Sequence, residues 1–179
     1  MTLEELNALS DKDARAEFLR CCGSKQWTSE MTERRPFSTR DRLLSTADEA
    51  WQDLDQKDWK EAFSHHPKIG DIKSLRKSTT LPGRRPIGKF APTVQWAEGE
   101  QSGVGQTSER VLKALAEGNN LYEAKFGYIF IVCATGKNAE EMLALLTERL
   151  NHFPAEEILI AAEEQRKITR LRLEKLLQS

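Results

Sequence analysis

The sequence predicts an all-α fold, a single-domain helical bundle with one short extended, buried segment near residues 128–134. Apolar residues recur every three or four positions through most of the chain, as on the buried face of amphipathic helices. Capping residues stand at the ends of several of these stretches. Only residues 128–134 are rich in β-branched and aromatic side chains, and no second run of this kind exists to pair with them. We therefore interpret this run as an extended or bent buried segment between helices.

The N-terminal part carries helix boundaries that can be read directly. Thr2 is positioned to cap a short first helix, and Ser10 to cap a second. Gly23 stands where a left-handed residue commonly ends a helix. Ser38 with Asp41 resembles a capping pair that opens the next long helix. These boundaries predict a short first turn, a second helix that ends near Gly23 and a long helix over residues 40–54, with a short segment at residues 27–34 between the last two.

A long loop interrupts the helical pattern in the middle of the chain. A helix over residues 55–64 precedes Pro67, which ends the helical pattern and favours an extended backbone at His66. Residues 78–95 then contain several prolines and glycines, which predict a loop that is long for a compact domain. Thr107 is positioned to cap the helix that follows this loop.

The C-terminal part returns to helices. Gly127 closes the helix that precedes the extended segment, and Asn138 with Glu141 forms a plausible capping box after it. The last helix begins at Pro154, a residue suited to a first helical turn, and runs toward Leu177. Apolar positions on both helices predict that they contribute to the core.

The composition indicates a soluble globular protein with one domain over residues 1–179. The chain has 179 residues, of which 39% are hydrophobic and 31% charged, and its formal net charge is −1. This balance does not steer the chain toward nucleic acid or anionic membranes. The longest apolar run is far shorter than the ~20 residues of a membrane-spanning helix, and no secretory signal is found. We expect a cytoplasmic protein that binds neither nucleic acid nor membranes.

Two patterns that often mark ligand sites are weak in this sequence. Residues 83–90 nearly match the phosphate-binding loop G-x-x-x-x-G-K-[ST], but Phe90 replaces the hydroxyl residue that would hold magnesium. The three histidines lack the spacing of metal ligands, so no metal site is expected. We interpret Cys21, Cys22 and Cys133 as small buried hydrophobic residues without disulfides.

Three polar positions remain as candidates for chemistry. His66 stands before Pro67, and a ring with a pKa of about 6.5 can transfer protons near neutral pH. Glu100 beside Gln101 offers a carboxylate and a carboxamide, and the amide could orient a urea-like group. Arg172 lies at the border of an apolar stripe, from which its guanidinium could reach inward to bind a carboxylate. Taken alone, each is more often an ordinary structural residue.

Together these residues form an ordered set of motifs that resembles the 2-oxo-4-hydroxy-4-carboxy-5-ureidoimidazoline (OHCU) decarboxylases, the last enzymes of the route from urate to S-allantoin. The resemblance runs from about Leu19 to Leu176. Its motifs are Phe18-Leu19-Arg20-Cys21-Cys22-Gly23 with Trp27 and Met31, His65-His66-Pro67-Lys68-Ile69-Gly70, Glu100-Gln101-Ser102-Gly103, Tyr122-Glu123-Ala124-Lys125-Phe126-Gly127, Phe130-Ile131-Val132-Cys133-Ala134, and Lys167-Ile168 before Arg172-Leu173. No single motif is specific, whereas the ordered set is.

The resemblance implies an all-helical fold that is commonly a homodimer and uses no metal or organic cofactor. It implies that His66 is the catalytic acid/base, with Glu100 as a second catalytic residue. The residues that it implies for substrate binding are Pro67, Ala97, Gln101, Phe130, Ile131, Val132, Ala134 and Arg172. Ala97 departs from the serine that members often carry three residues before Glu100, so a hydroxyl contact to the substrate is missing or is supplied elsewhere. The loop between Gly70 and Ala97 is also longer than in many members.

The chemistry of the substrate is consistent with these residues. OHCU carries a carboxylate and a hydroxyl on one ring carbon beside a ring C=N, which can accept the electrons released by loss of carbon dioxide. We expect His66 to handle the hydroxyl or ring proton and Arg172 to fix the anion. Gln101 and main-chain groups near Ile131 would hold the ureido and ring amides. Two alternatives stay open: a helical module that binds a partner helix, with His66 inert, and a ureide hydrolase whose water is activated by Glu100.

Overall fold

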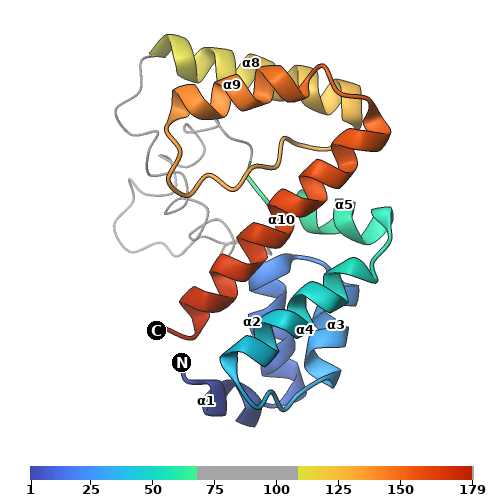
Figure 1. The fold of residues 1–179 in the computed structure, drawn as a ribbon, viewed down its shortest axis with the longest axis vertical. Helices are drawn as coiled ribbons and strands as arrows, with labels where there is room; N and C mark the ends of the chain where they lie inside the picture. Colours follow the sequence, from blue (N-terminus) through green and yellow to red (C-terminus); the bar gives the residue numbers. More distant parts are fainter. Residues whose placement is uncertain (68–108, 179) are drawn as a thin grey trace. The chain divides into compact units, whose positions relative to one another are not determined.

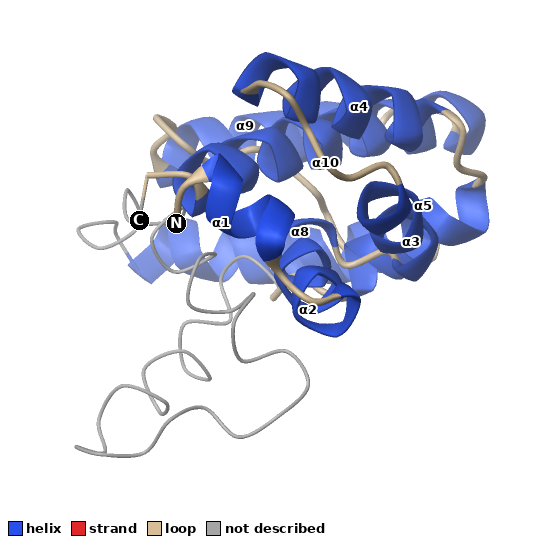
Figure 2. Ribbon diagram, turned by 90° about the horizontal axis from the view of Figure 1, so that it is seen from below, coloured by secondary structure: helices blue, strands red, loops and turns tan. Residues whose placement is uncertain are grey.

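The computed structural model describes residues 1–67 and 109–178, and every regular element in them is an α-helix (Figure 1). The helices are α1 (Leu3–Ala8), α2 (Asp11–Cys22), α3 (Lys25–Glu33), α4 (Arg40–Gln52), α5 (Gln56–Ser64), α8 (Glu109–Phe126), α9 (Ala139–Arg149) and α10 (Pro154–Leu176). Figure 2 shows helices and loops but no strand in the described part of the chain. The all-α prediction is confirmed. None of the described helices is long and apolar enough to cross a membrane.

The chain divides into two compact units. The first comprises Met1–Phe63 with Ala162–Ser179, and the second comprises Ser64–Ala161. Helix α10 contributes its first turns to the second unit and the rest of its length to the first. The expectation of one domain over residues 1–179 stays a prediction.

Helix ends in the first unit follow the capping residues of the sequence, with one exception. Thr2 forms a full capping box, Ser10 accepts a hydrogen bond from the Asp13 N–H, and Gly23 adopts a left-handed backbone with φ of 92°. The prediction that Ser38 caps α4 is wrong, because the Thr39 hydroxyl accepts the Arg42 N–H at 3.1 Å. Thr39 has the extended backbone of an N-cap and stands three residues before this donor.

Tryptophans tie the helices of the first unit together. Helices α2, α3 and α4 pack in sequence, with α3 against both of its neighbours. The Phe18 ring meets the Trp27 ring edge-on at 6.0 Å, and Trp27 Nε1 donates to the Ala47 carbonyl at 3.0 Å. Trp51 Nε1 donates to the Ala162 carbonyl at 3.1 Å, which joins α4 to α10. Each indole thus packs its apolar body in the core and satisfies its single donor.

The second unit contains α8 packed along α9, and the predicted extended segment, residues 128–134, follows α8 (Figure 1). This segment has no regular secondary structure, and six of its seven residues are buried: Tyr128, Phe130, Ile131, Val132, Cys133 and Ala134. Gly127 and Gly136, with φ of 78° and 80°, turn the chain at its two ends. The segment is therefore buried and belongs to no helix or strand, which agrees with a buried segment between helices.

Close helix contact in the second unit depends on a glycine. A Cβ placed on Gly118 would lie 2.6 Å from Cδ2 of Leu146, so α8 can approach α9 this closely only because Gly118 has no side chain. The Asn138–Glu141 capping box begins α9, and Pro154 is the first residue of α10, both as predicted.

The Arg35 side chain is a buried link within the first unit. Its guanidinium donates to the carbonyls of Leu6 and Leu9 at 3.1 and 2.8 Å and contacts the Asp11 carboxylate at 2.7 Å. Only 7% of this side chain is exposed. It therefore satisfies carbonyl groups at the end of α1 that water reaches poorly.

We expect Arg35→Met to lower the free energy of unfolding by about 2 kcal/mol or more, because it leaves buried carbonyls without a donor. Arg15→Met is the matched control, since the Arg15 side chain is 47% exposed and lies 3.9 Å from its partner Glu33. We expect this control to stay within about 0.5 kcal/mol of the wild type. Urea denaturation measures both, and equal small effects would contradict the role assigned to Arg35.

The three cysteines are free and buried, as the sequence indicates. Burial raises the pKa of the Cys22 thiol from its ordinary value of 9.0 to about 12, although hydrogen bonds from Ser24 and Thr169 oppose this shift. Burial also raises the pKa of Cys21, which the nearby Arg172 charge lowers in part. Both thiols therefore stay protonated in the folded protein at neutral pH.

We expect the raised pKa of Cys22 to make the protein sensitive to alkali. The unfolded chain loses this proton near pH 9 and the folded chain near pH 12, so stability falls as pH rises between these values. At about pH 10.5 this one thiol costs about 2 kcal/mol, which Cys22→Ala removes. Urea denaturation near pH 8 and pH 10.5 compares the two proteins. An identical loss of stability in both would show that Cys22 does not titrate in this way.

Candidate active site

The predicted site residues fall into three groups. His66, Pro67 and the predicted binding residues of the extended segment, Phe130, Ile131, Val132 and Ala134, belong to the second unit. Arg172 belongs to the first unit. Ala97, Glu100 and Gln101 lie outside the described residues, as do the loop at residues 78–95 and the predicted cap Thr107.

His66 occupies the position that the sequence predicts. Helix α5 ends at Ser64, and His66 and Pro67 follow in non-helical backbone. Both residues are partly buried. The proline prevents continuation of the helix, so the imidazole is carried on a turn directly after α5 rather than on its face.

The extended segment is held in place by a buried guanidinium. Arg149, the last residue of α9, donates from Nη1 to the Ile131 carbonyl at 2.7 Å. It also donates from Nε to the Glu157 carboxylate at 2.7 Å and from Nη2 to the Tyr122 hydroxyl at 3.3 Å. The guanidinium lies over the Phe130 ring at 4.7 Å, a cation–π distance. One side chain thus fixes two consecutive residues of the segment.

Glu157 is the anion that balances Arg149. Its side chain is fully buried in the first turns of α10, where a helix dipole favours negative charge. The Tyr122 hydroxyl donates a hydrogen bond to its Oε1, and His152 Nδ1 lies 2.8 Å from its Oε2. Burial, partly opposed by the Arg149 charge, raises the pKa of Tyr122, so the phenol remains a donor. We call Tyr122, Arg149, His152 and Glu157 the polar cluster.

The polar cluster leaves main-chain donors of the segment available. Among the described residues, no acceptor is found for the N–H groups of Ile131 and Val132, although these residues are only 2% and 6% exposed. Buried amide groups normally find a partner, in the protein or in a bound molecule. Farther along, Lys137 Nζ donates to the Cys133 carbonyl at 2.8 Å. The segment is therefore fixed through its carbonyls and can offer its N–H groups to a ligand.

Arg172 is fully buried, which fits the inward-reaching side chain that the sequence predicts rather than a solvent-facing one. Its Nη1 lies 3.5 Å from the Cys21 carbonyl, at the limit of a hydrogen bond. A guanidinium without water around it gains strongly from a planar anion such as a carboxylate. This surrounding is therefore chemically suited to an anionic group.

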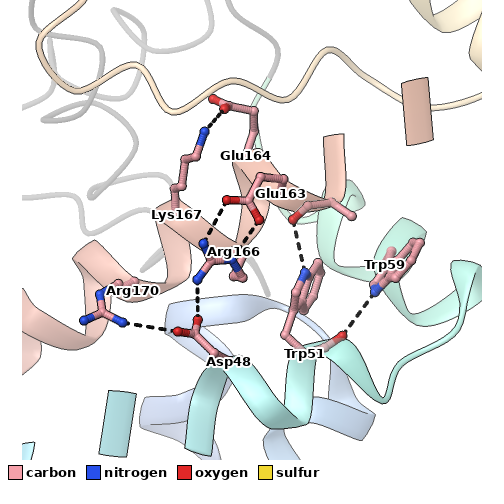
Figure 3. Close-up of polar contacts among 9 residues, drawn as sticks. Asp48, Trp51, Trp59, Glu163, Glu164, Arg166, Lys167 and Arg170 are labelled. Carbon is pink, nitrogen blue, oxygen red and sulfur yellow. Dashed lines mark hydrogen bonds and ion pairs between the residues drawn. The ribbon is translucent and has the colours of Figure 1, made fainter. Parts of the chain in front are cut away.

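A second group of charges in the first unit is already neutralised. Figure 3 shows Asp48 on α4 bound by Arg166 and Arg170 of α10, at 2.8 and 3.2 Å. Arg166 also contacts the Glu163 carboxylate at 2.8 Å, and its two carboxylate partners raise its pKa. Because carboxylates occupy both arginines, this group is structural.

Metal binding has no candidate ligand set in residues 1–67 and 109–178, where no three His, Cys, Asp or Glu side chains gather suitably. The expectations of no metal and no organic cofactor stay predictions.

Sequence reasoning missed the polar cluster as a unit. In the sequence, Tyr122 stands out only as part of a motif of the resemblance, and nothing singles out Arg149 or Glu157. One pattern does indicate the pair: an arginine ends one helix, a glutamate lies in the first turns of the next, and the two positions differ by eight. Opposite charges that flank a short turn are common, however, and the pattern says nothing about their burial.

Comparisons with known proteins agree with the described fold. The chain matches the family described as OHCU decarboxylase over residues 7–174. It is 37% identical over 156 residues to the uric acid degradation bifunctional protein TTL of Arabidopsis thaliana. The aligned region covers 87% of this chain and 45% of that protein. It is also 45% identical to the OHCU decarboxylase of Amia calva over 60 residues, and this aligned region covers 34% of each chain. The chain thus spans under half the length of these two relatives.

A solved structure agrees along nearly the whole chain. The crystal structure of an OHCU decarboxylase in the presence of (S)-allantoin is similar to this one with a TM-score of 0.73 and 36% sequence identity. The similarity covers 96% of this chain and 100% of that one. Together with the match over residues 7–174, it establishes that this chain belongs to the OHCU decarboxylase family.

Proposed function

We propose that this protein decarboxylates OHCU to S-allantoin and carbon dioxide, the last step from urate to allantoin. The observation that carries the proposal is the similarity to a solved OHCU decarboxylase over 100% of that chain, with 36% identity. Membership of the decarboxylase family over residues 7–174 supports the same activity.

The reaction requires a correctly positioned substrate and proton transfer, more than an external electron sink. The bond between the ring carbon and the carboxylate breaks, carbon dioxide leaves, and the electron pair moves into the neighbouring C=N, whose nitrogen takes up a proton from the surroundings. The hydroxyl becomes the ring carbonyl as its proton departs, and a proton is added to one face of the carbon that carries the ureido group. Delivery to one face gives the S product. Groups held in fixed positions can contribute several kcal/mol to such a step.

We assign His66 the role of acid/base for the hydroxyl or ring proton. Its support is the position on a turn after α5, its partial burial and its imidazole side chain, the type that most often serves as an acid/base in enzymes. Glu100 would orient or polarise His66, and Gln101 would bind the ureido group. These last two roles rest on the resemblance of the motifs alone.

We assign the substrate's amides and carboxylate to separate parts of the chain. The N–H groups of Ile131 and Val132, for which no acceptor is found among the described residues, suit carbonyl oxygens of the ring and ureido group. The fully buried guanidinium of Arg172 suits the carboxylate. The resemblance further assigns Pro67, Ala97, Phe130 and Ala134 to substrate binding.

We further propose one domain over residues 1–179 that acts in the cytoplasm as a homodimer. The family match across residues 7–174 supports one domain. Large hydrophobic side chains exposed on the second unit, Phe153 at 79% and Leu121 at 63%, support an interface with a second copy.

We expect His66→Ala to abolish stereoselective catalysis, because general acid–base groups contribute about 10²- to 10⁴-fold. Substrate is formed in place from urate by the two preceding enzymes, and circular dichroism follows the dextrorotatory S-allantoin. His65→Ala is the matched control and should keep wild-type activity. Slow, racemic product from wild type and both variants would refute the decarboxylase and favour a binding module. A non-decarboxylated product would favour the hydrolase.

We expect Arg172→Lys to lower kcat/KM about 10- to 100-fold, mainly through KM, because lysine cannot bind a carboxylate in bidentate fashion. Arg170→Lys, on the same helix, is the control, since Arg170 is paired with Asp48 at 3.2 Å. Initial rates over a range of substrate concentrations separate kcat from KM. If Arg172→Lys stays folded with an unchanged KM, Arg172 does not bind the carboxylate.

A further inference from the structure

The peptide unit between Ile131 and Val132 is held from one side only. Arg149 donates to its carbonyl at 2.7 Å. In a trans peptide the C=O and N–H groups point in opposite directions. The Val132 N–H is therefore directed away from the polar cluster, and no acceptor for it is found among the described residues.

The Arg149 side chain has little freedom to move. Glu157 binds its Nε, Tyr122 accepts from its Nη2, and its plane lies over the Phe130 ring. Arg149 is 5% exposed and Glu157 is fully buried, so the attraction between the two charges is only weakly screened. A planar guanidinium held in this way fixes the direction of the carbonyl that it binds.

The same contact strengthens the N–H donor. A positive charge on the carbonyl oxygen draws electron density along the peptide unit, and hydrogen bonds polarise one another in low dielectric surroundings. An amide whose carbonyl is bound by a cation is thus a better donor at its N–H end. The extended segment keeps that N–H out of any helix ladder, so it remains available to a ligand.

We propose that Arg149 is a positioning residue for the decarboxylation, with Glu157 and Tyr122 as its supports. It orients and polarises the peptide between Ile131 and Val132 so that the Val132 N–H donates to a carbonyl oxygen of the ureidoimidazoline. Arg149 touches no substrate in this arrangement. The inference rests on the proposed function, and its test can be read separately from catalysis by means of the product, (S)-allantoin.

The sequence allows this single peptide to be observed. Val132 is the only valine in the chain that follows an isoleucine. Protein labelled with ¹³C at isoleucine carbonyls and ¹⁵N at valine amides therefore gives one cross-peak in a carbonyl–amide correlation spectrum. Titration of the full-length wild type with (S)-allantoin should move this peak in proportion to binding measured by calorimetry. No movement at millimolar (S)-allantoin overturns the proposal.

The key variant is Arg149→Lys, which keeps the positive charge but loses the planar fork. We expect the Kd for (S)-allantoin to rise and kcat/KM to fall, each about tenfold, at a temperature well below melting. The control is Arg166→Lys, since Arg166 is likewise an arginine bound by carboxylates, here Asp48 and Glu163, but lies outside the polar cluster. A purely structural role would lower the melting temperature of both variants and leave the Kd unchanged.

The outcomes separate the inference from the proposed function. A folded Arg149→Lys with wild-type Kd and kcat/KM overturns the inference. If that variant does not fold, Tyr122→Phe, which removes one support of Arg149, must weaken both the binding and the shift of the Val132 peak. If the wild type binds (S)-allantoin but forms none from its precursor, the decarboxylase proposal fails while the peak shift still tests the orientation of the peptide.

Discussion

The pairing of Arg149 with Glu157 is the interaction on which the second unit depends. Two opposite charges are buried together, and neither is stable there alone, because loss of one partner leaves an uncompensated charge at a cost of about 3–5 kcal/mol. The pair joins the end of α9 to the start of α10, where both helix dipoles favour the sign of charge that is present. It also reaches Ile131, so a segment without helix or sheet hydrogen bonds has a defined path.

Arginines on α10 show how helix geometry separates structural from chemical roles. Arg166 and Arg170 are four residues apart and therefore share a face, where Asp48 binds both. Arg172 is two residues beyond Arg170, a rotation of about 200°, and its side chain is fully buried. Two arginines of this helix thus neutralise one carboxylate, whereas the third arginine is buried on another face.

Local sequence signals predicted the fold well because they depend on neighbouring residues. Gly23 and Asn138 are found at the helix ends that their side chains favour. The cap of α4 was misplaced by one residue, since Ser38 and Thr39 both carry a hydroxyl and only tertiary structure decides which is extended. His66 was indicated by Pro67 and by a resemblance of motifs. No sequence signal indicated the polar cluster, because the burial of Glu157 depends on packing between segments that are far apart in sequence.

Burial of cysteine and methionine side chains in this protein limits their oxidation. Peroxides attack the thiolate, and a thiol with a pKa of about 12, such as Cys22, is ionised in about one molecule in 100,000 at neutral pH. Cys21 and Cys133 are buried as well, and Met31 and Met142 are fully buried. Oxidative damage to these residues therefore requires local opening of the core first. Tolerance of oxidants should accordingly follow conformational stability rather than thiol reactivity.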